Sequence, residues 1–387
     1  MTADHRQLHV FLVAGEESGD RLGDALMGAL RSAAPEVRFS GVGGHRMEAQ
    51  GLSAVLERAP SAIIGFAAIP GRILEYLRLI RRTAEAAIAA KPDVIVIIDS
   101  PEFTHRVAKR VRRTAPDIPI INYGAPSVWA WRPGRARAMR SYVDHVMALL
   151  PFEPEAFKRL GGPPCSFVGH PATEHISDLR PTPDEAHRRL SPPPTVLVMP
   201  GSRRGEISRL LGLFRAAVET IAIRVSDAEF VIPSVPALAG ILERETAAWS
   251  AKVRVVTETA ERNAAFRTAR LALVKSGTST LEVALAGLPM VATYKISHIE
   301  AVVAHFVLKV PSVILVNLVL GENVVPELLQ YDATTRKLVE TAMPLFDDTA
   351  QRRQQLDAFK RLDAIMDIGG ERPSVRAAKI VLRYAGR

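Results

Sequence analysis

Short apolar runs alternate with longer amphipathic stretches along most of the chain. Strand-length apolar runs occur at residues 8–14, 37–42, 93–99, 118–123 and 165–169 in the first half, and at 195–199, 229–235, 253–257, 271–275 and 290–294 in the second. Helical patterns such as Asp20–Ser32, His105–Arg113 and Glu206–Ile223 lie between them. Near-continuous apolar strands separated by helices are typical of parallel sheets covered on both faces. The pattern predicts an α/β fold with two Rossmann-like domains facing a cleft, where ligands bind in this architecture.

Residues 170–194 interrupt this rhythm, because they are rich in proline and end in SPPPT. Such a stretch predicts a linker, so we expect one domain over residues 1–170 and a second over residues 171–349. The charged C-terminal part, Asp347–Arg387, has a helical pattern. We expect a helix over residues 350–387 that packs back on the first domain or on a partner subunit.

The composition narrows the location and the partners. Cys165 is the one cysteine among 387 residues, which excludes an internal disulfide and fits a reducing cytosol. The N-terminus has no signal-peptide layout, and no stretch approaches the ~20 apolar residues of a spanning helix. A net charge of +9 predicts an anionic partner, with nucleic acid, anionic lipid and phosphorylated substrate all open.

The segment VKSGTSTLEVALAGLPMVATY, residues 274–294, predicts a β-loop-α-β unit. A helix over Ser279–Ala286 would end at Gly287, and its N-terminus would offer backbone N–H groups to a phosphate. Glu282, one turn into the helix, could hold two vicinal ribose hydroxyls. The alternative is a capping box, because Ser279-x-x-Glu282 matches that pattern too.

Acidic residues follow two strands of the first half. Asp99 ends the run DVIVIID, where a carboxylate could act as a general base or could cap the next helix. Glu102 lies close by, and a neighbouring acid can raise the pKa of a carboxyl group. Glu16, Glu17 and Asp20 could bind sugar hydroxyls or cap a helix.

Basic residues mark two further segments. Arg203 and Arg204 in PGSRRGE could neutralise a diphosphate, or could be ordinary surface arginines. Around Trp129 and Trp131, residues 106–140 carry nine Lys or Arg and one acid. That segment could bind single-stranded nucleic acid, or a phosphorylated lipid or sugar, or form a solvated helix beside two core tryptophans. No metal-binding, P-loop or dinucleotide motif is present.

An apolar run with Ile63, Ile64, Phe66 and Ile69 precedes Pro70-Gly71. Beyond it, Ile73, Leu74, Leu77 and Ile80 fall on one helical face, and Arg78, Arg81 and Arg82 occupy the rest. The segment predicts either an ordinary helix packed on its sheet or an interfacial patch for an anionic membrane.

The motifs together resemble the lipid-A-disaccharide synthase family of outer-membrane biogenesis. The matching motifs are VAGEESGD, GVGGHRM, DSPEF, PSVWAWR, LPFE, FVGHP, MPGSR, SGTSTLE with LPMV, and VNL with PELLQ. Each is short, but their number and order cover most of the chain. The resemblance implies a glycosyltransferase-B fold and inverting transfer of 2,3-diacylglucosamine from UDP to 2,3-diacylglucosamine 1-phosphate. It implies a β(1→6) bond, lipid A disaccharide 1-phosphate and UDP as products, and neither metal nor cofactor.

The resemblance gives catalytic roles to Asp99 and Arg203. It implies substrate contacts at Glu16, Ser18, Gly19, Asp20, Trp129, Arg132, Ser202, Gly277, Thr278, Ser279, Glu282 and Asn317. The first domain would bind the acceptor and face the membrane, and the second would bind the UDP-sugar. The chain departs from the family pattern in several places. Glu102 replaces the common Asp, Thr104 the common Asn, Lys275 a small residue and Val316 a proline. The stretch before the tryptophans reads YGAPS and not YVSPS.

We therefore expect a lipid biosynthesis enzyme bound peripherally to anionic lipid on the cytoplasmic face of the inner membrane, with no nucleic-acid partner. A homodimer stays open. The rivals are another UDP-sugar enzyme of this fold, such as a UDP-N-acetylglucosamine 2-epimerase or a peptidoglycan glycosyltransferase, and a basic nucleic-acid-binding protein. UDP would not compete with RNA for the last of these.

Overall fold

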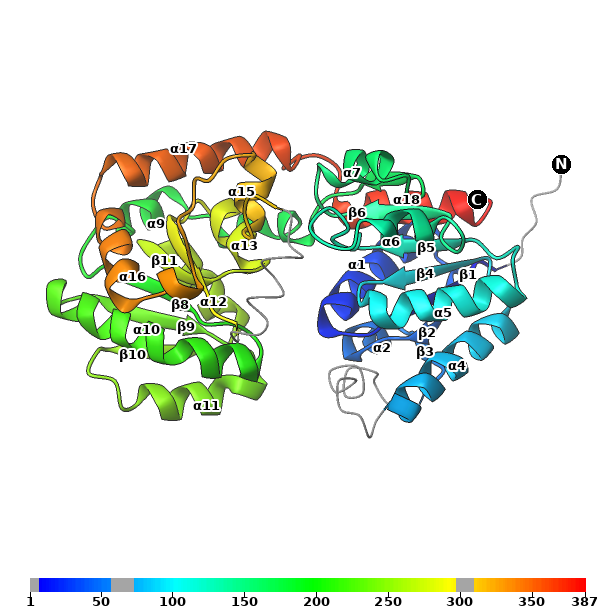
Figure 1. The fold of residues 1–387 in the computed structure, drawn as a ribbon, viewed down its shortest axis with the longest axis horizontal. Coiled ribbons are helices and arrows are strands. Elements are labelled where there is room, and N and C mark those ends of the chain that lie inside the picture. Colours follow the sequence, from blue (N-terminus) through cyan, green and yellow to red (C-terminus); the bar gives the residue numbers. More distant parts are fainter. Residues whose placement is uncertain (1–6, 57–72, 297–309) are drawn as a thin grey trace. The chain divides into compact units, whose positions relative to one another are not determined.

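The computed structural model describes residues 7–56, 73–296 and 310–387. The chain divides into two compact units, the first formed by Met1–Pro171 with Gly369–Arg387 and the second by Ala172–Ile368. Each unit is a parallel sheet with helices on both faces (Figure 1). The two units are described separately below.

The first unit contains a seven-stranded sheet in the order β3-β2-β1-β4-β5-β6-β7. Its strands are β1 His9–Ala14, β2 Arg38–Val42, β3 Ser53–Ala54, β4 Val94–Ile98, β5 Ile120–Tyr123, β6 His145–Ala148 and β7 Cys165–Phe167. Every strand pair is parallel. β1 and β4 are adjacent although β2 and β3 lie between them in sequence, so the strand order reverses at β1 and β4. In open α/β sheets this switch point is where ligands bind.

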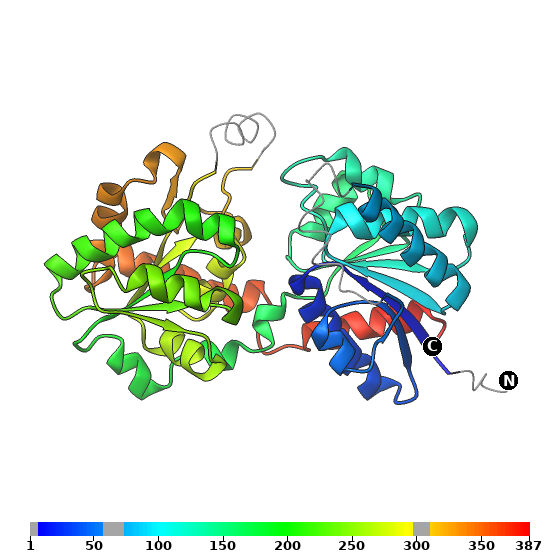
Figure 2. The same ribbon diagram turned by 90° about the horizontal axis from the view of Figure 1, so that it is seen from below.

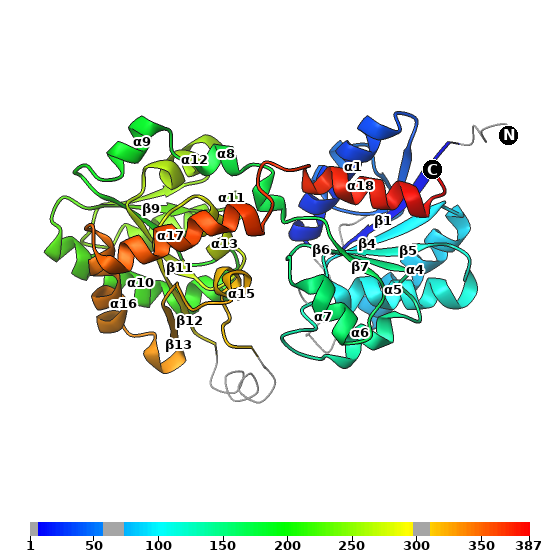
Figure 3. The same ribbon diagram turned by 90° about the horizontal axis from the view of Figure 1, so that it is seen from above.

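Helices cover both faces of this sheet. They are α1 Glu17–Ala33, α2 His45–Ala49, α4 Ile73–Ala90, α5 Pro101–Thr114, α6 Gly134–Met139, α7 Glu153–Arg159 and α18 Pro373–Tyr384. α1 and α18 come from opposite ends of the chain but pack side by side on one face (Figures 2 and 3). α4 and α5 cover the other face. Alternate residues of β1, Val10 and Leu12 against Phe11 and Val13, fill the two cores, as the period of a strand requires.

The second unit contains a six-stranded sheet in the order β10-β9-β8-β11-β12-β13. The strands are β8 Thr195–Met199, β9 Glu229–Pro233, β10 Val253–Val256, β11 Leu271–Lys275, β12 Met290–Tyr294 and β13 Glu327–Leu329. The helices are α8 Ile176–Leu179, α9 Pro183–Arg188, α10 Arg204–Arg224, α11 Pro236–Thr246, α12 Thr259–Thr268, α13 Ser279–Leu285, α15 Leu315–Leu320, α16 Thr335–Ala342 and α17 Ala350–Ile365. α10, α11 and α16 share one core with alternate strand residues. The switch point here lies between β8 and β11.

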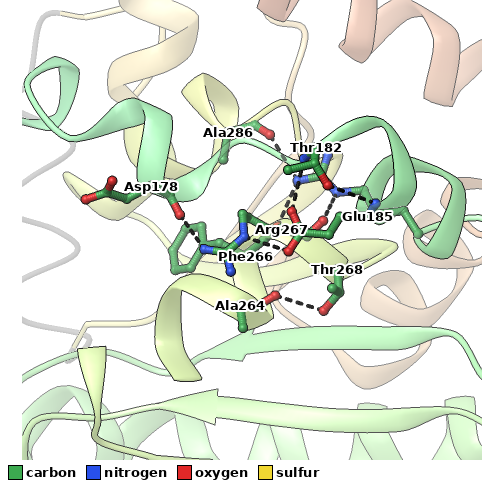
Figure 4. Close-up of polar contacts among 9 residues, drawn as sticks. Asp178, Thr182, Glu185, Ala264, Phe266, Arg267, Thr268 and Ala286 are labelled. Carbon is green, nitrogen blue, oxygen red and sulfur yellow. Dashed lines mark hydrogen bonds and ion pairs between the residues drawn. The ribbon is translucent and has the colours of Figure 1, made fainter. Parts of the chain in front are cut away.

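The expected linker at residues 170–194 is not a free connection, because most of it is fastened to the second unit. Arg189 is buried and donates to the carbonyl groups of Phe266, Arg267, Ala286 and Gly287 at 2.8–3.1 Å. Beside it, Arg267 binds the Glu185 carboxylate of α9 at 2.8 Å (Figure 4). Those carbonyls close α12 and α13, so the guanidinium supplies the donors that helix C-termini need.

The expected C-terminal helix over residues 350–387 is also wrong as a single element. α17 belongs to the second unit, and α18 returns to the first. Gly369, at φ +87°, lies between them in the DIGG turn of residues 367–370, where a left-handed backbone favours glycine. The chain therefore passes between the units twice, near Pro171 and near Gly369.

Candidate functional site

The switch point of the first unit brings Asp99 and Ser18 together. Asp99 follows β4 and Ser18 lies in the first turn of α1, which follows β1. The Ser18 hydroxyl donates to Asp99 Oδ2 at 2.5 Å. Gly19 permits this approach, because a Cβ there would stand 3.2 Å from the Ile98 carbonyl oxygen. The carboxylate of Asp99 is thus oriented by a hydroxyl group at the edge where parallel α/β sheets bind ligands.

The backbone at Asp99 is strained. Asp99 and Ser100 both lie in the left-handed region, at φ +51° and +43°. The Asp99 N–H donates to the Tyr123 carbonyl at 3.0 Å, and the Thr104 hydroxyl donates to the Asp99 carbonyl at 2.7 Å. Among the described residues, the buried Ser100 Oγ has no hydrogen-bond partner. Such strain costs about 1–3 kcal/mol per residue and clusters at functional sites, so this turn has the character of an active-site element.

The carboxylate of Asp20 supports the start of helix α2. Its buried carboxylate accepts hydrogen bonds from the backbone N–H groups of Gly44, Arg46 and Met47 at 2.9–3.1 Å. These are the first N–H groups of α2, so Asp20 fastens α2 to α1. Glu16 is the N-cap residue of α1 and is partly buried, two residues before Ser18 in the sequence.

Glu102 forms ion pairs with three arginines. Its carboxylate lies among Arg106, Arg132 and Arg135, with the closest contact to Arg135. Burial alone would raise the pKa of Glu102, but the hydrogen bond from Arg135 and the three positive charges outweigh it and lower that pKa. Glu102 and these three arginines together carry a net positive charge, and they lie in the segments that follow β4 and β5.

The two tryptophans near these arginines have different environments. Trp129 donates from Nε1 to Glu153 Oε1 at 3.1 Å and meets Phe152 edge-on with ring centroids 5.0 Å apart. Trp131 is 36% exposed, and the Arg132 guanidinium stacks 4.4 Å from its ring centre. Trp129 therefore anchors the loop to the protein, whereas Trp131 and Arg132 present a flat cationic surface to solvent.

Glu153 is buried and holds the tryptophan loop. Its second carboxylate oxygen accepts from the N–H groups of Leu149 and Leu150 at 3.1 and 3.0 Å. Burial raises the pKa of Glu153 to about 7, although its three hydrogen bonds act in the opposite direction. Burial also lowers the pKa values of His105, His145 and His170 to about 4. All four groups belong to the first unit.

These shifts predict that acid destabilises the first unit between pH 7 and 5. The unfolded histidines bind protons near pH 6.5 whereas the folded ones do not until about pH 4. At pH 5 this costs about 1–2 kcal/mol for a fully buried histidine. Glu153 has the opposite sign, because the folded carboxyl group binds its proton first as the pH falls. We expect a net loss on the order of 2 kcal/mol.

Denaturant unfolding at several pH values tests this, with Trp249→Phe as the background so that fluorescence reports the tryptophans of the first unit. Glu153→Gln should steepen the loss on acidification, because it removes the opposing proton uptake. His45→Gln is the control, since it removes a histidine whose side chain is fully exposed. A Glu153→Gln slope equal to that of the parent would contradict the assignment.

The switch point of the second unit lies between the loops that follow β8 and β11. Arg203 is the N-cap residue of α10 and is exposed, as are Ser202 and Arg204. In the other loop, Thr278 is exposed and Ser276 is buried, with its hydroxyl donating to the Val313 carbonyl at 3.2 Å. β8 and β11 are neighbours, with Met199 opposite Val274. The two loops thus follow adjacent strand ends, and they contain Ser202, Arg203, Gly277 and Thr278.

Glu282 does not form the capping box offered as its alternative role. The N-cap residue of α13 is Thr278, and no side-chain hydrogen bond caps that helix. Instead, Glu282 Oε2 accepts from Arg262 of α12 at 3.0 Å, and both side chains are partly exposed. The Arg262 guanidinium also lies 5.1 Å from the ring centre of Phe266. The carboxylate is therefore held in place beside the β11 loop and still reaches solvent.

Asn317 is 1% exposed, and its amide is fully used within the second unit. It donates to the Val325 carbonyl and to Glu327, and accepts from the N–H groups of Val324 and Val325, all at 2.9–3.1 Å. The amide fixes the segment that leads into β13.

Three partners of the site were not evident from the sequence. Lys275 pairs with Glu206 at 2.8 Å, Arg262 holds Glu282, and Glu153 holds Trp129. Each pair is far apart in the chain, so no local spacing indicates it. The departure at Lys275 from the family pattern was the one available signal. Within residues 7–56, 73–296 and 310–387, no three or more His, Cys, Asp or Glu side chains gather as metal ligands.

Comparison with known proteins gives one consistent result. The family model described as lipid-A-disaccharide synthetase matches residues 10–381. The lipid-A-disaccharide synthase of Nitrobacter hamburgensis is 51% identical, over 98% of this chain and 96% of its own. That of Bradyrhizobium diazoefficiens is 50% identical, over 96% and 95%.

Solved structures of low identity share the fold. The calicheamicin glycosyltransferase CalG4 superposes with a TM-score of 0.62 at 19% identity, over 99% of both chains. MurG of Acinetobacter baumannii gives 0.58 at 12% identity, over 97% of this chain and 99% of its own. The fold is therefore that of the glycosyltransferase-B enzymes.

Proposed function

The chain belongs to the lipid-A-disaccharide synthase family, and from this premise we propose how its residues carry out the transfer. The enzyme joins 2,3-diacylglucosamine, delivered as its UDP derivative, to 2,3-diacylglucosamine 1-phosphate through a β(1→6) bond. The first unit binds the acceptor, and the second unit binds the UDP-sugar. The observation that supports this division is that four of the matching motifs, VAGEESGD, DSPEF, MPGSR and SGTSTLE, follow the strands at the two switch points.

Asp99 is the general base of the proposed mechanism. The acceptor nucleophile is a primary sugar hydroxyl, which is weakly nucleophilic at neutral pH until a base takes its proton. The strained turn at Asp99 and the hydrogen bond from Ser18 fix the direction of the carboxylate before substrate binds. As the hydroxyl oxygen attacks the anomeric carbon, Asp99 takes the proton and the bond to UDP breaks on the opposite face, which inverts the configuration.

The second unit stabilises the leaving group. Negative charge grows on the β-phosphate as UDP departs. Arg203 at the start of the long helix α10 can donate two hydrogen bonds to that phosphate. The backbone N–H groups of Ser202 and of the Gly277–Thr278 loop add further donors. Charge-assisted donors aimed at the developing charge lower the barrier without any metal ion.

The proposal is tested by supplying UDP-diacylglucosamine and diacylglucosamine 1-phosphate and measuring disaccharide phosphate and UDP by mass spectrometry. Stoichiometric release of UDP with disaccharide is expected, and it should persist in EDTA. Interconversion of UDP-N-acetylglucosamine with its 2-epimer, without a lipid acceptor, would favour the epimerase alternative. Transfer of N-acetylglucosamine to a lipid-linked peptidoglycan precursor would favour the second alternative.

Glu282→Gln is predicted to weaken UDP binding by about 10-fold or more, with little effect on stability. A carboxylate can accept hydrogen bonds from both ribose hydroxyls, and an amide offers one acceptor in its place. Because Glu282 caps no helix here, its change should not cost the ~1 kcal/mol of a lost cap. Calorimetric titration with UDP and thermal melts measure the two effects. Arg262→Met, which frees Glu282 from its ion pair, is the companion variant.

A membrane-facing role is also proposed for the first unit. Ile63, Ile64, Phe66 and Ile69 lie outside the described residues. On α4, Ile73, Leu74 and Leu77 are 45%, 64% and 45% exposed. Ile80 is buried with Tyr76 and Leu79 in the core. The four apolar residues expected on one face of the helix therefore divide, with three exposed and Ile80 buried. Arg78, Arg81 and Arg82 are exposed. No described helix is long and apolar enough to cross a membrane.

The exposed face of α4 predicts binding to anionic vesicles that weakens as salt rises. Apolar side chains would enter the lipid, while each arginine near the surface contributes about 1 kcal/mol. Leu74→Ser and Leu77→Ser combined with Arg81→Glu and Arg82→Glu should release the protein in a sedimentation assay without lowering its melting temperature. Ile223→Ser, at a residue of α10 that is 83% exposed, is the apolar control. Unchanged sedimentation of the quadruple variant would contradict the patch.

A further inference from the structure

A largely buried ion pair joins the two loops of the second unit's switch point. Lys275 is the last residue of β11, and Glu206 lies in the first turn of α10. Lys275 Nζ stands 2.8 Å from Glu206 Oε1, and the two side chains are only 18% and 14% exposed. Withdrawing two charges from water is costly, so such a pair at a ligand-binding edge calls for a reason beyond stability.

The other oxygen of Glu206 lies on the β8 loop. The Ser202 N–H donates to Glu206 Oε2 at 3.2 Å. Gly201, at φ +125°, makes room for the carboxylate, since a Cβ there would stand 2.6 Å from Glu206 Oε2. In the β11 loop, a Cβ on Gly277 would stand 3.2 Å from Lys275 Nζ, so glycine also leaves room for the ammonium group. The carboxylate thus bridges a loop N–H and a cation, as an oxygen pair of a phosphate would.

We propose that Glu206 is an internal stand-in for the donor's diphosphate and that Lys275 is a second diphosphate-binding cation. This inference rests on the proposed function, because Ser202 is one of the donors assigned above to UDP. When UDP binds, a phosphate takes the Ser202 N–H and the Lys275 ammonium group, and Glu206 withdraws. Lys275 keeps its Tyr294 ring contact, 5.2 Å from the ring centre, as its support. The phosphate displaces the Glu206 carboxylate because a phosphate carries more charge and more acceptor oxygens than a carboxylate.

If the Lys275–Glu206 ion pair has only a structural role, the opposite result is expected for one variant. If the ion pair only holds the two loops together, removing either partner disturbs both loops and weakens UDP binding alike. If Glu206 competes with the diphosphate, then Glu206→Gln frees Lys275 and strengthens UDP binding, whereas Lys275→Met weakens it. The sign of the Glu206→Gln effect therefore separates the two roles.

Calorimetric titrations with UDP and with uridine, on the full chain, provide the test. Lys275→Met should weaken UDP binding about 10- to 100-fold and leave uridine binding within about 3-fold. Glu206→Gln should tighten UDP binding about 3- to 10-fold. Lys275→Arg, which keeps the charge, should retain most of the affinity, so it serves if the Met variant folds poorly. In the double variant, the gain from Glu206→Gln should vanish, because the freed cation is absent.

The outcomes distinguish this inference from the proposed function. Weaker UDP binding by Glu206→Gln, with a matching fall in melting temperature, overturns the stand-in role. The ion pair would then have a structural role only. Unchanged UDP affinity in Lys275→Met removes Lys275 from the diphosphate site and leaves the proposed function intact. Failure of the unmodified chain to bind either UDP or uridine would instead refute the UDP-sugar assignment itself.

Discussion

Asp99→Asn is expected to lower kcat by about 10²–10⁴ while changing the affinity for UDP little. The amide cannot take a proton from the acceptor hydroxyl, so the attacking oxygen must lose its proton to water. UDP affinity is spared because the proposed UDP contacts lie in the second unit. The substitution suits the backbone, since asparagine tolerates the left-handed conformation that Asp99 adopts at φ +51°. Single-turnover rates and calorimetric titration separate the two effects.

Ser18→Ala provides the companion measurement. It removes the hydroxyl that donates to Asp99 Oδ2 but leaves the carboxylate in place. We expect a smaller loss of kcat than in Asp99→Asn, because the base remains and only its orientation is less well fixed. Asp20→Asn is unsuitable as a control, since Asp20 supports α2 through three backbone hydrogen bonds. Near-normal turnover by Asp99→Asn would exclude Asp99 as the base.

The strand pattern was predictable because buried parallel strands need uninterrupted apolar runs. β4, Val94–Ile98, is buried at every residue, and its VIVII run marks it clearly. The apolar runs do not indicate β3, β6 and β13. β3 is only two residues long and exposed. β6 begins with the buried His145, whose ring bonds Ser166 and Tyr384, and β13 is three residues long with a glutamate in it. A polar first residue and a short length therefore make β6 and β13 hard to recognise from apolar runs alone.

The positions of Asp99 and Arg203 were predictable for a similar reason. Each follows a strand next to a switch point, and the strand ends are visible in the sequence. The hydrogen bonds of Asp20 and Asn317 were not predictable, because they run to backbone groups that only the folded chain brings close. The sequence offers the same residue types for a ligand contact and for a helix cap. Burial decides between the two, and burial of single polar residues is a tertiary property.

Arg203→Ala is expected to reduce both UDP affinity and kcat, with a combined loss in kcat/KM of about 10²–10³ or more. The guanidinium would contact the diphosphate in the bound donor and more strongly in the transition state, where the leaving phosphate gains charge. Uridine, which lacks phosphate, should bind the variant as it binds the parent. The exposed position of Arg203 at the start of α10 means that its removal should not lower the melting temperature appreciably.

Arg204→Ala is the matched control, because Arg204 is the next residue, is equally exposed and carries the same charge. If the positive field of the loop as a whole attracts UDP, the two variants will lose similar affinity, and both losses will shrink as salt rises. If Arg203 makes directed hydrogen bonds, its loss will exceed that of Arg204→Ala several-fold and persist at high salt. Arg203→Lys refines the argument, since lysine keeps the charge but loses the planar, two-donor geometry. Recovery of full kcat by that variant would assign Arg203 to charge alone and contradict the proposed directed contact with the β-phosphate.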